Sequence, residues 1–573
     1  MVSREDRIYY EQEMKRLVDG GRVFAERFPD IARYLNLHGT DPGSRDPHAE
    51  RIVEGFAFLT GKIQRYLDAQ FPELTHALLE LIYPHYLRPL PSKALVQFTP
   101  QESMLDKPCA IPAGTELYAD GLGPGGERYT FTTCAETLVQ PIDLKKVWVD
   151  PEAPGDYSMS LNLALHGGAD AGSCDWDQLT FAIQGDPSSC YEIYLQLAQR
   201  LSGISIKDLK GPPLSLAWRG FEPIPVEGSE GDRYGGFHYP RDYFDYPQRF
   251  FFFSIQGLNS WLKHETDLAG VQINFRFSKP FATGIHVRTE NLGIHCAVVQ
   301  NLFQLDCEPI VTDEISLEYP IRPHAERGDL EILNITSVVA SKGRDMDVVE
   351  PYFRFRQEER EKLWFYTLRR DQSMEKGWDC FLRLLDLNHS GPGALNGKTI
   401  SISAYCTNRD YAQKLKPGQL NRISTTVPET ISVINLTQAT PACWPPLHGT
   451  EEWDFLALLA LDYMELGQLD AIKALLGLYH FSKSDGGARK IKGIERAGMF
   501  KDYEIYRGCC VQGQRLELDL NGAFYAGQGD VALFARIFAG FLDAWCPING
   551  FIRLVVKELE SGEVFRFTAR GHT

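Results

Sequence analysis

Two stretches of the sequence come close to the glycine-rich loops that bind phosphate. The first, "GLGPGG", has Gly121, Gly123 and Gly126 at the spacing of a dinucleotide-binding loop. Such a loop follows a strand and begins a helix, because the helix N-terminus binds the pyrophosphate. Here "ERYTFTT" follows, and its composition is typical of a strand. We therefore interpret this stretch as a hairpin loop.

The second stretch, "GPGALNGKT", resembles a P-loop that ends in Gly397, Lys398 and Thr399. In a P-loop four residues separate the first glycine from the second, so the first would stand at position 392, which holds Pro392. The following "ISISAYC" alternates like a strand, so no helix N-terminus is available for a phosphate. We reject a nucleotide site here.

Metal and nucleophile motifs are also weak. "HETDL" at His264 lacks the second histidine of a helical zinc site, and His295 beside Cys296 has no suitably spaced partners. We interpret these as structural residues. The Gly-x-Ser-x-Gly motif is absent from the sequence, and we expect no catalytic residue, no metal site and no cofactor.

The aromatic stretch "HYPRDYFDYPQRFFFFSIQGL", residues 238–258, allows two interpretations. It could stack sugars in a β-rich carbohydrate-binding protein or glycosidase, with Asp242 or Asp245 as an acid. Four successive phenylalanines, however, point to both sides of a strand and need burial on both faces. This favours a protein core or a subunit interface.

Composition narrows the class of protein. The chain has 573 residues, 59 basic and 76 acidic side chains, and a formal net charge of −17, which argues against a nucleic-acid binder. The charged N-terminus lacks the apolar core of a signal peptide, and the apolar runs are too short to span a membrane. The twelve cysteines are scattered, which favours reduced thiols and a cytoplasmic location.

The pattern of residues predicts an α+β fold in four segments. Residues 1–92 read as helical, 93–260 and 261–440 as two β-rich domains, and 441–573 as a mixed α+β domain. The proline-rich "LIYPHYLRPLPS" ends the helical segment, since its prolines cannot continue a helix. We interpret it as a connection, although Tyr83 and Tyr86 could face a partner.

Two N-terminal helices, residues 3–28 and 47–71, carry narrow apolar seams at spacings of three and four. The positions are Tyr10, Met14, Leu17, Phe24 and Phe28 in the first helix, and Ile52, Phe56, Leu59 and Ile63 in the second. The helices could form a hairpin within the chain or enter a bundle with other chains.

Five segments together resemble one family, the type VI secretion baseplate subunit TssF, also called ImpG or VasA. They are the stretch from "DPHAERIVEGF" to "RPLPS", then "RDYFDYPQRFFFFSI", "NLFQLDCEPI", "YCTNRD" and "GDVALFARIFAGFLDAWCPINGFIRLVV". The chain departs from the usual pattern at "LDYMEL", residues 461–466, and at His324. The likeness covers nearly the whole chain.

This resemblance implies a structural wedge subunit of a contractile, phage-tail-like injection machine. It implies two copies per TssG, contacts with TssK, TssE and the VgrG spike hub, and recruitment to the inner-membrane complex from the cytoplasm without insertion into the membrane. It also favours interchain helices, with the seam residues, Tyr83 and Tyr86 as candidate partner contacts. We expect charges at Phe56 and Ile63 to prevent assembly.

Overall fold

The structure is a computed structural model. It describes residues 10, 13, 14, 17, 51, 54–63, 78–79, 84–101, 105–121, 123, 125–150, 157–166, 169, 172, 174–176, 178–206, 214–226, 235–258, 270–313, 316–324, 327–342, 345–352, 364–373, 377–386, 397–445, 467–506, 509–546 and 550–570. The chain divides into two compact units, Met1–Leu87 with Pro446–Ala457, and Arg88–Pro445 with Leu458–Thr573. In the first unit, residues 54–63 are helical, as the sequence predicts.

The second unit begins with a six-stranded sheet in the order β25-β3-β4-β15-β1-β26. Its strands are β25 Arg422–Ile423, β3 Glu116–Ala119, β4 Tyr129–Thr133, β15 Cys296–Gln300, β1 Lys93–Pro100 and β26 Ile431–Asn435; β2 Cys109–Ile111 and β5 Thr137–Val139 pair separately. Strand β1 lies between two neighbours and is buried on both faces, which its apolar "ALVQF" run satisfies. "GLGPGG" connects the antiparallel strands β3 and β4, so the predicted hairpin loop is confirmed.

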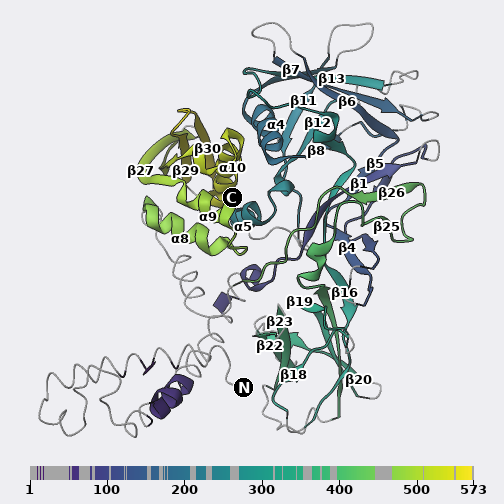
Figure 1. Cartoon of the computed structure of the whole chain (residues 1–573), viewed down its shortest axis with the longest axis vertical. Coiled ribbons are helices and arrows are strands. Elements are labelled where there is room, and N and C mark those ends of the chain that lie inside the picture. Colours follow the sequence, from purple (N-terminus) through teal and green to yellow (C-terminus); the bar gives the residue numbers. More distant parts are fainter. Residues whose placement is uncertain are drawn as a thin grey trace, which may run out of the picture. The chain divides into compact units, whose positions relative to one another are not determined.

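The second unit contains two further sheets next to the six-stranded one in sequence (Figure 1). One has β10 Leu214–Ser215, β9 Leu201–Ile206, β13 Gly270–Phe277, β7 Tyr157–Leu165 and β6 Ile142–Asp150; the other has β11 Ala217–Phe221, β12 Phe252–Gln256, β8 Gln178–Ile183 and β14 Leu292–Ile294. Strands from both sides of residue 260 pair with one another in these sheets. Residue 260 is therefore not a boundary between sheets, and the four-segment division as a whole stays a prediction.

Helices also form in the segments that the sequence predicts to be β-rich. Helix α4, Pro187–Gln199, begins where the side chain of Asp186 accepts a hydrogen bond from the Ser189 N–H at 2.9 Å, and Pro187 occupies the first turn. The short helices of the segments predicted to be β-rich are η3 Gly235–His238, α5 Tyr239–Asp245, η4 Pro247–Phe250, η5 Thr289–Asn291 and η9 Tyr411–Lys414, while η1 Pro84–Leu87 lies in the segment predicted to be helical. The pair Asp186-Pro187 is the sequence signal for the start of α4. The apolar residues that follow it are too many to show the periodic pattern of an amphipathic helix.

The second β-rich part has its own core of aliphatic and cysteine side chains between two sheets. Its strands are β16 Phe303–Asp306, β17 Ile310–Val311, β24 Thr399–Thr407, β19 Glu331–Lys342 and β20 Asp345–Val348 in one sheet, and β18 Tyr319–Pro320, β23 Trp378–Asp386, β22 Trp364–Gln372 and β21 Glu350–Pro351 in the other. Thr399 of the rejected P-loop begins β24, so a strand does follow that glycine-rich stretch.

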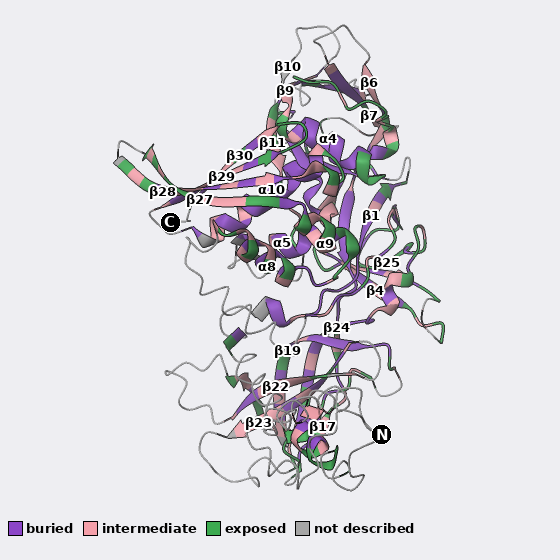
Figure 2. Cartoon of the chain, turned by 60° about the vertical axis from the view of Figure 1, so that its left-hand side comes forward, coloured by how far each residue is buried: buried purple, intermediate pink, exposed green. Residues whose placement is uncertain are grey.

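The C-terminal part is α+β, as predicted. Its four-stranded sheet contains β27 Ile494–Tyr506, β28 Cys509–Leu520, β29 Phe551–Glu558 and β30 Val564–Arg570, with helices α8 Leu469–Tyr479, α9 Asp485–Lys492, η11 Gly522–Phe524 and α10 Gln528–Trp545. Helix α10 links the parallel strands β28 and β29 and is largely buried (Figure 2). Within the described residues, no helix has both the length and the apolar character needed to cross a membrane.

Candidate junctions and interaction surfaces

The chain passes into and out of the second β-rich part at two asparagines that pair with each other. Asn301 follows β15, Asn408 follows β24, and both side chains are buried. The Asn301 Nδ2 donates to Asn408 Oδ1 at 2.8 Å, and the Asn408 backbone N–H donates to Asn301 Oδ1 at 2.7 Å. These bonds fix the two crossing strands to each other, because leaving a buried amide unpaired costs about 1–3 kcal/mol.

Charged groups extend this first junction. The Asn408 Nδ2 donates to Asp329 Oδ2 at 3.1 Å, and Arg327 holds the same carboxylate through two bonds of 3.0 and 2.7 Å. Arg409 has a positive φ of 50° and donates from Nε to the Leu330 carbonyl at 3.1 Å. The "YCTNRD" segment therefore shapes the point where the chain leaves the second β-rich part.

A buried carboxyl group lies close to this junction. The Trp444 Nε1 donates to both oxygens of Glu331, at 2.8 and 3.0 Å, and the Trp378 backbone N–H donates at 2.7 Å. Burial raises the pKa of Glu331 to about 7, although these bonds and the charge of Arg409 act in the opposite direction. Glu331 thus connects β19 to the segment that leaves the β-rich part of the chain.

The segment "RDYFDYPQRFFFFSI", residues 241–255, forms a second junction. Asp242 is fully buried and forms ion pairs with Arg249 and, at 3.4 Å, with Arg241. Burial opposes ionisation of Asp242, but the charges of Arg249 and Arg241 outweigh it and lower its pKa to about 2. Asp245 pairs with Lys93 Nζ of β1 at 2.8 Å, and both side chains are nearly inaccessible.

This geometry removes the basis of the carbohydrate hypothesis. Asp242 and Asp245 are each held in buried ion pairs, so neither is placed as an acid toward a substrate. Phe250, Phe251, Phe252 and Phe253 are at most 4% exposed. The prediction that these rings pack inside protein is confirmed; only the last two lie in β12, because η4 ends at Phe250.

The same segment contacts the C-terminal part. The Tyr243 hydroxyl donates to Asp530 Oδ1 at 2.5 Å, and Lys490 Nζ of α9 forms an ion pair with that oxygen at 2.9 Å. The Ala526 backbone N–H donates to the other oxygen at 3.0 Å. Burial and the nearby Asp530 carboxylate raise the pKa of Tyr243 well above its usual range, so its hydroxyl stays a donor.

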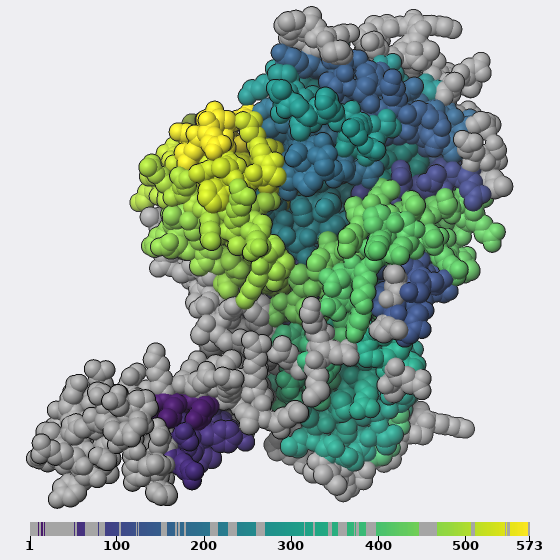
Figure 3. Space-filling view, viewed as in Figure 1, coloured from purple at the N-terminus to yellow at the C-terminus, as the bar shows by residue number. Residues whose placement is uncertain are grey.

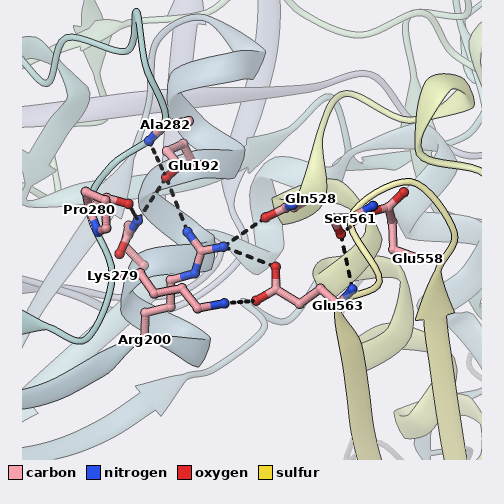
Figure 4. Close-up of polar contacts among 10 residues, drawn as sticks. Glu192, Arg200, Lys279, Pro280, Ala282, Gln528, Glu558, Ser561 and Glu563 are labelled. Carbon is pink, nitrogen blue, oxygen red and sulfur yellow. Dashed lines mark hydrogen bonds and ion pairs between the residues drawn. The ribbon is translucent and has the colours of Figure 1, made fainter.

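A third junction centres on Arg200 at the end of α4 (Figure 4). Its guanidinium lies 3.7 Å from Glu192, donates to Gln528 at 2.8 Å and pairs with Glu563 at 3.1 Å. Lys279 reaches the other oxygen of Glu563 at 3.0 Å. The cluster joins α4 and the loop after β13 to both the start of α10 and the start of β30, and Figure 3 shows these surfaces in contact.

His295 forms a corner between β14 and β15. It has a φ of 55°, and its Nε2 accepts a hydrogen bond from the Gln140 backbone N–H at 3.1 Å. Burial lowers its pKa to about 4, so the ring is neutral and accepts. The residue therefore serves a structural role, as predicted; His264 lies outside the described residues.

The structure exposes part of the predicted interface. In the helix of residues 54–63, Phe56 is 56% exposed, and Leu59 and Ile63 are each 59% exposed. They lie on one face, since their spacing is three and four residues, whereas Ala57 on another face is buried. Three large apolar side chains on one exposed helix face are what an interchain contact needs.

The other predicted contacts have mixed positions. Tyr10, Met14 and Leu17 are helical and half-buried. Tyr86 is only 1% exposed, so its side chain is buried within the chain, which agrees with the interpretation of this stretch as a connection. The remaining candidates, Phe24, Phe28, Ile52 and Tyr83, lie outside the described residues.

Comparison with known proteins gives these junctions a context. The family model described as "Type VI secretion system, TssF" matches residues 3–573. The chain belongs to the TssF family. The curated protein "Type VI secretion system component TssF1" from Pseudomonas aeruginosa is 27% identical to it over an alignment of 623 positions that covers 98% of each chain. The predicted family is confirmed, and with it a role as a component of the type VI secretion baseplate.

Chains in two solved structures of type VI secretion assemblies share the fold. A chain in the structure of the type VI secretion TssK-TssF-TssG baseplate subcomplex superimposes with a TM-score of 0.77 and 23% identity, covering 91% of this chain and 99% of that one. A chain in the structure of the baseplate complex from the type VI secretion system gives a TM-score of 0.63 and 20% identity, covering 99% of each.

The sequence alone does not identify the junction residues individually. Asn301, Asn408 and Asp530 lie inside the segments that carry the family resemblance, so the resemblance pointed to them without giving their role. Glu331 and Arg200 lie outside those segments. Their contacts join residues that are more than a hundred positions apart in sequence, such as Glu331 and Trp444, and no local pattern reveals them.

Proposed function

We propose that this chain is a structural wedge subunit of a type VI secretion baseplate that binds a TssG-like and a TssK-like protein on the cytoplasmic side of the inner membrane. The observation that carries the proposal is the family match over residues 3–573, which includes every junction described above. The fold shared with a chain of a TssK-TssF-TssG subcomplex supports the choice of partners.

The proposal includes two copies of this chain for each TssG-like subunit, and further contacts with a TssE-like protein and the VgrG spike hub. The two copies would use the N-terminal helices in a shared bundle. Helices with apolar seams associate by packing side chains of one helix between those of another. The exposed face of Phe56, Leu59 and Ile63 supplies such side chains.

We assign the chain a structural role and no catalysis. The acids of the carbohydrate hypothesis are neutralised in buried ion pairs, and they hold elements together. Buried ion pairs at junctions suit a subunit that transmits force, because removing one partner leaves an unpaired charge and costs about 3–5 kcal/mol. The relative orientation of the parts is thus expensive to change within the Arg88–Pro445 and Leu458–Thr573 unit.

Charge substitutions on the exposed helix test the interchain role. We expect the double variant Phe56→Glu with Ile63→Glu to lose co-purification with the TssG-like protein, because buried apolar anchors carry most of the binding energy in an interface. Size-exclusion chromatography of the co-expressed proteins would measure this. Lys62→Glu, which adds negative charge to the same helix without removing an apolar side chain, should co-purify normally.

Circular dichroism and thermal unfolding of the double variant would separate folding from assembly. A folded variant that no longer co-purifies supports the interchain bundle. A variant that unfolds would place these side chains in a hairpin within the chain, and one that is folded and still co-purifies would remove them from the interface.

A further inference from the structure

The chain leaves the second unit through a short segment that lies beside the start of β1. We call residues 440–445 the exit strap; they follow β26 and precede Pro446–Ala457, which belongs to the first unit. The Thr440 N–H donates to the Lys93 carbonyl at 2.9 Å, and Leu90 and Cys443 exchange backbone hydrogen bonds of 2.7 and 3.1 Å. Past Cys443, the side chain of Trp444 attaches the strap to Glu331 of β19.

The Glu331 carboxyl is the acceptor in each of the three contacts that meet on it. Its Oε1 accepts from the Trp378 backbone N–H at 2.7 Å and from the Trp444 Nε1 at 2.8 Å, and its Oε2 accepts from the same Nε1 at 3.0 Å. Gly377 allows this close approach, because a Cβ atom there would lie 2.9 Å from Oε1. The arrangement fits an ionised carboxylate, which only accepts.

A proton on Glu331 would disturb the bond to Trp444 first. On Oε2 the proton would compete with the Trp444 Nε1–H, whereas Oε1 could still accept from Trp378. Loss of the negative charge also weakens the remaining bonds, since charge-assisted hydrogen bonds are about twice as strong as neutral ones. Trp378 is fixed in β23, but Trp444 is half-buried and lies outside any strand, so Trp444 is the partner that can move.

Other charged and titratable groups surround Glu331. They are Arg370 of β22, Cys380 of β23, Cys406 of β24, and Arg409 after β24, which itself pairs with Asp379 at 3.1 Å. Burial raises the pKa of Glu331 to about 7, against the charges of the two arginines. Burial also raises the pKa of Cys380 to about 11, and a thiol hydrogen bond and burial raise the pKa of Cys406, so both thiols stay neutral in this range.

We propose that Glu331 and Trp444 form a proton-sensitive latch on the exit strap, in which the ionised carboxylate holds the indole and protonation loosens it. The latch is closed in mildly alkaline solution and opens on acidification through neutral pH. It regulates how firmly the second unit holds the segment that continues into the first unit. This inference goes beyond the proposed function and concerns the chain alone, so its test needs no partner protein.

Fluorine NMR of the full chain labelled with 5-fluorotryptophan tests the latch. The variant Trp444→Phe identifies the resonance of Trp444 by its loss. In the wild type, this resonance should shift between pH 8.5 and 5.5 with a midpoint near 7. In Glu331→Gln it should stay near the low-pH position throughout, because the amide cannot ionise and presents N–H groups to the indole.

Hydrogen exchange measures the strap itself. The protection factor of the Cys443 amide, corrected for the intrinsic effect of pH, should fall about tenfold from pH 8.5 to 5.5 in the wild type, since a hydrogen bond to a charged group is lost. It should be low at both pH values in Glu331→Gln and Trp444→Phe. Trp364→Phe is the matched control, because Trp364 is a half-buried indole of the same β-rich part, and it should keep the full pH response.

The results separate the latch from other effects of pH. A Trp444 resonance that does not shift in the wild type, or that shifts equally in Glu331→Gln, would overturn the inference. If circular dichroism shows that Glu331→Gln is unfolded, hydrogen exchange of Trp444→Phe decides: low protection at both pH values supports the latch, and a wild-type response contradicts it. None of these outcomes depends on whether the chain binds TssG-like or TssK-like proteins.

Discussion

At the scale of single residues, the chain uses buried polar groups where chain segments meet. Asn301 and Asn408 satisfy each other, and Asp242 lies between two arginines. Such groups contribute little net stability compared with apolar packing, but an unpaired one is costly. They therefore select one arrangement of the joined segments over alternatives.

Glu331 should make the free energy of unfolding depend on pH. Burial raises its pKa from 4.5 to about 7, so between these values the folded protein keeps a proton that the unfolded chain has released. The free energy of unfolding should fall as pH rises through this window, by up to about 3 kcal/mol, and the loss is complete above pH 7. Glu331→Gln should flatten this part of the profile.

Urea-induced unfolding at several pH values between 4.5 and 8 measures the effect. The variant should gain stability over wild type at pH 8 and show little difference at pH 5, while Glu331→Asp keeps a titrating group and serves as the control. Parallel profiles for wild type and Glu331→Gln would show that this carboxyl does not titrate in the window.

At the scale of elements, α10 packs unusually closely on its neighbours. A Cβ atom on Gly529 would lie 1.9 Å from the carbonyl oxygen of Tyr191 in α4, and one on Gly236 would lie 1.9 Å from the carbonyl oxygen of Gly540. Backbone atoms cannot move aside as a flexible side chain can. The glycines therefore permit the contact between α10 and the β-rich part of the chain.

Gly529→Ala tests this close packing. We expect it to lower the free energy of unfolding by about 1–3 kcal/mol, because α10 must shift away from α4. Gly477→Ala in α8 is the control: no atom lies within 4 Å of its added Cβ, and alanine favours a helix by about 0.5–1 kcal/mol. Thermal unfolding measures the stability of both variants. Equal stability changes for Gly529→Ala and Gly477→Ala would contradict the close packing of α10 on α4.

Sequence patterns predicted the elements better than their connections. The strands and the long helix of the C-terminal part follow from alternation and from the apolar run at 529–546. Helix α4 was missed because its side chains are buried nearly all round, which weakens the helical period. The pairing of β1 with β15 joins residues about two hundred positions apart, which no local pattern encodes.

The exposed apolar residues also differ in whether a local sequence pattern predicts that they lie together. The seam of Phe56, Leu59 and Ile63 could be predicted, because a helix brings positions three and four apart together. By contrast, Val311 and Met346 share a row only through the register of four strands, which no local pattern encodes. Tyr86, also a candidate partner contact, is buried in the chain, and composition alone does not show which side of a bend is covered.

At the scale of the whole molecule, the chain combines fixed internal junctions with exposed apolar side chains, as a structural subunit needs. Junctions stabilised by buried ion pairs keep the parts of the second unit in one arrangement, and the exposed apolar side chains of the helix at residues 54–63 are where we propose that other chains bind. Large assemblies that store and release mechanical energy need extensive interfaces between subunits of defined shape.

Native mass spectrometry of the chain co-expressed with a TssG-like protein tests this account most directly. We expect a complex of two copies of the 64.8 kDa chain with one TssG-like subunit, and we expect its mass to increase when the TssK-like protein is added. A folded chain that remains monomeric in the presence of both partners would contradict it.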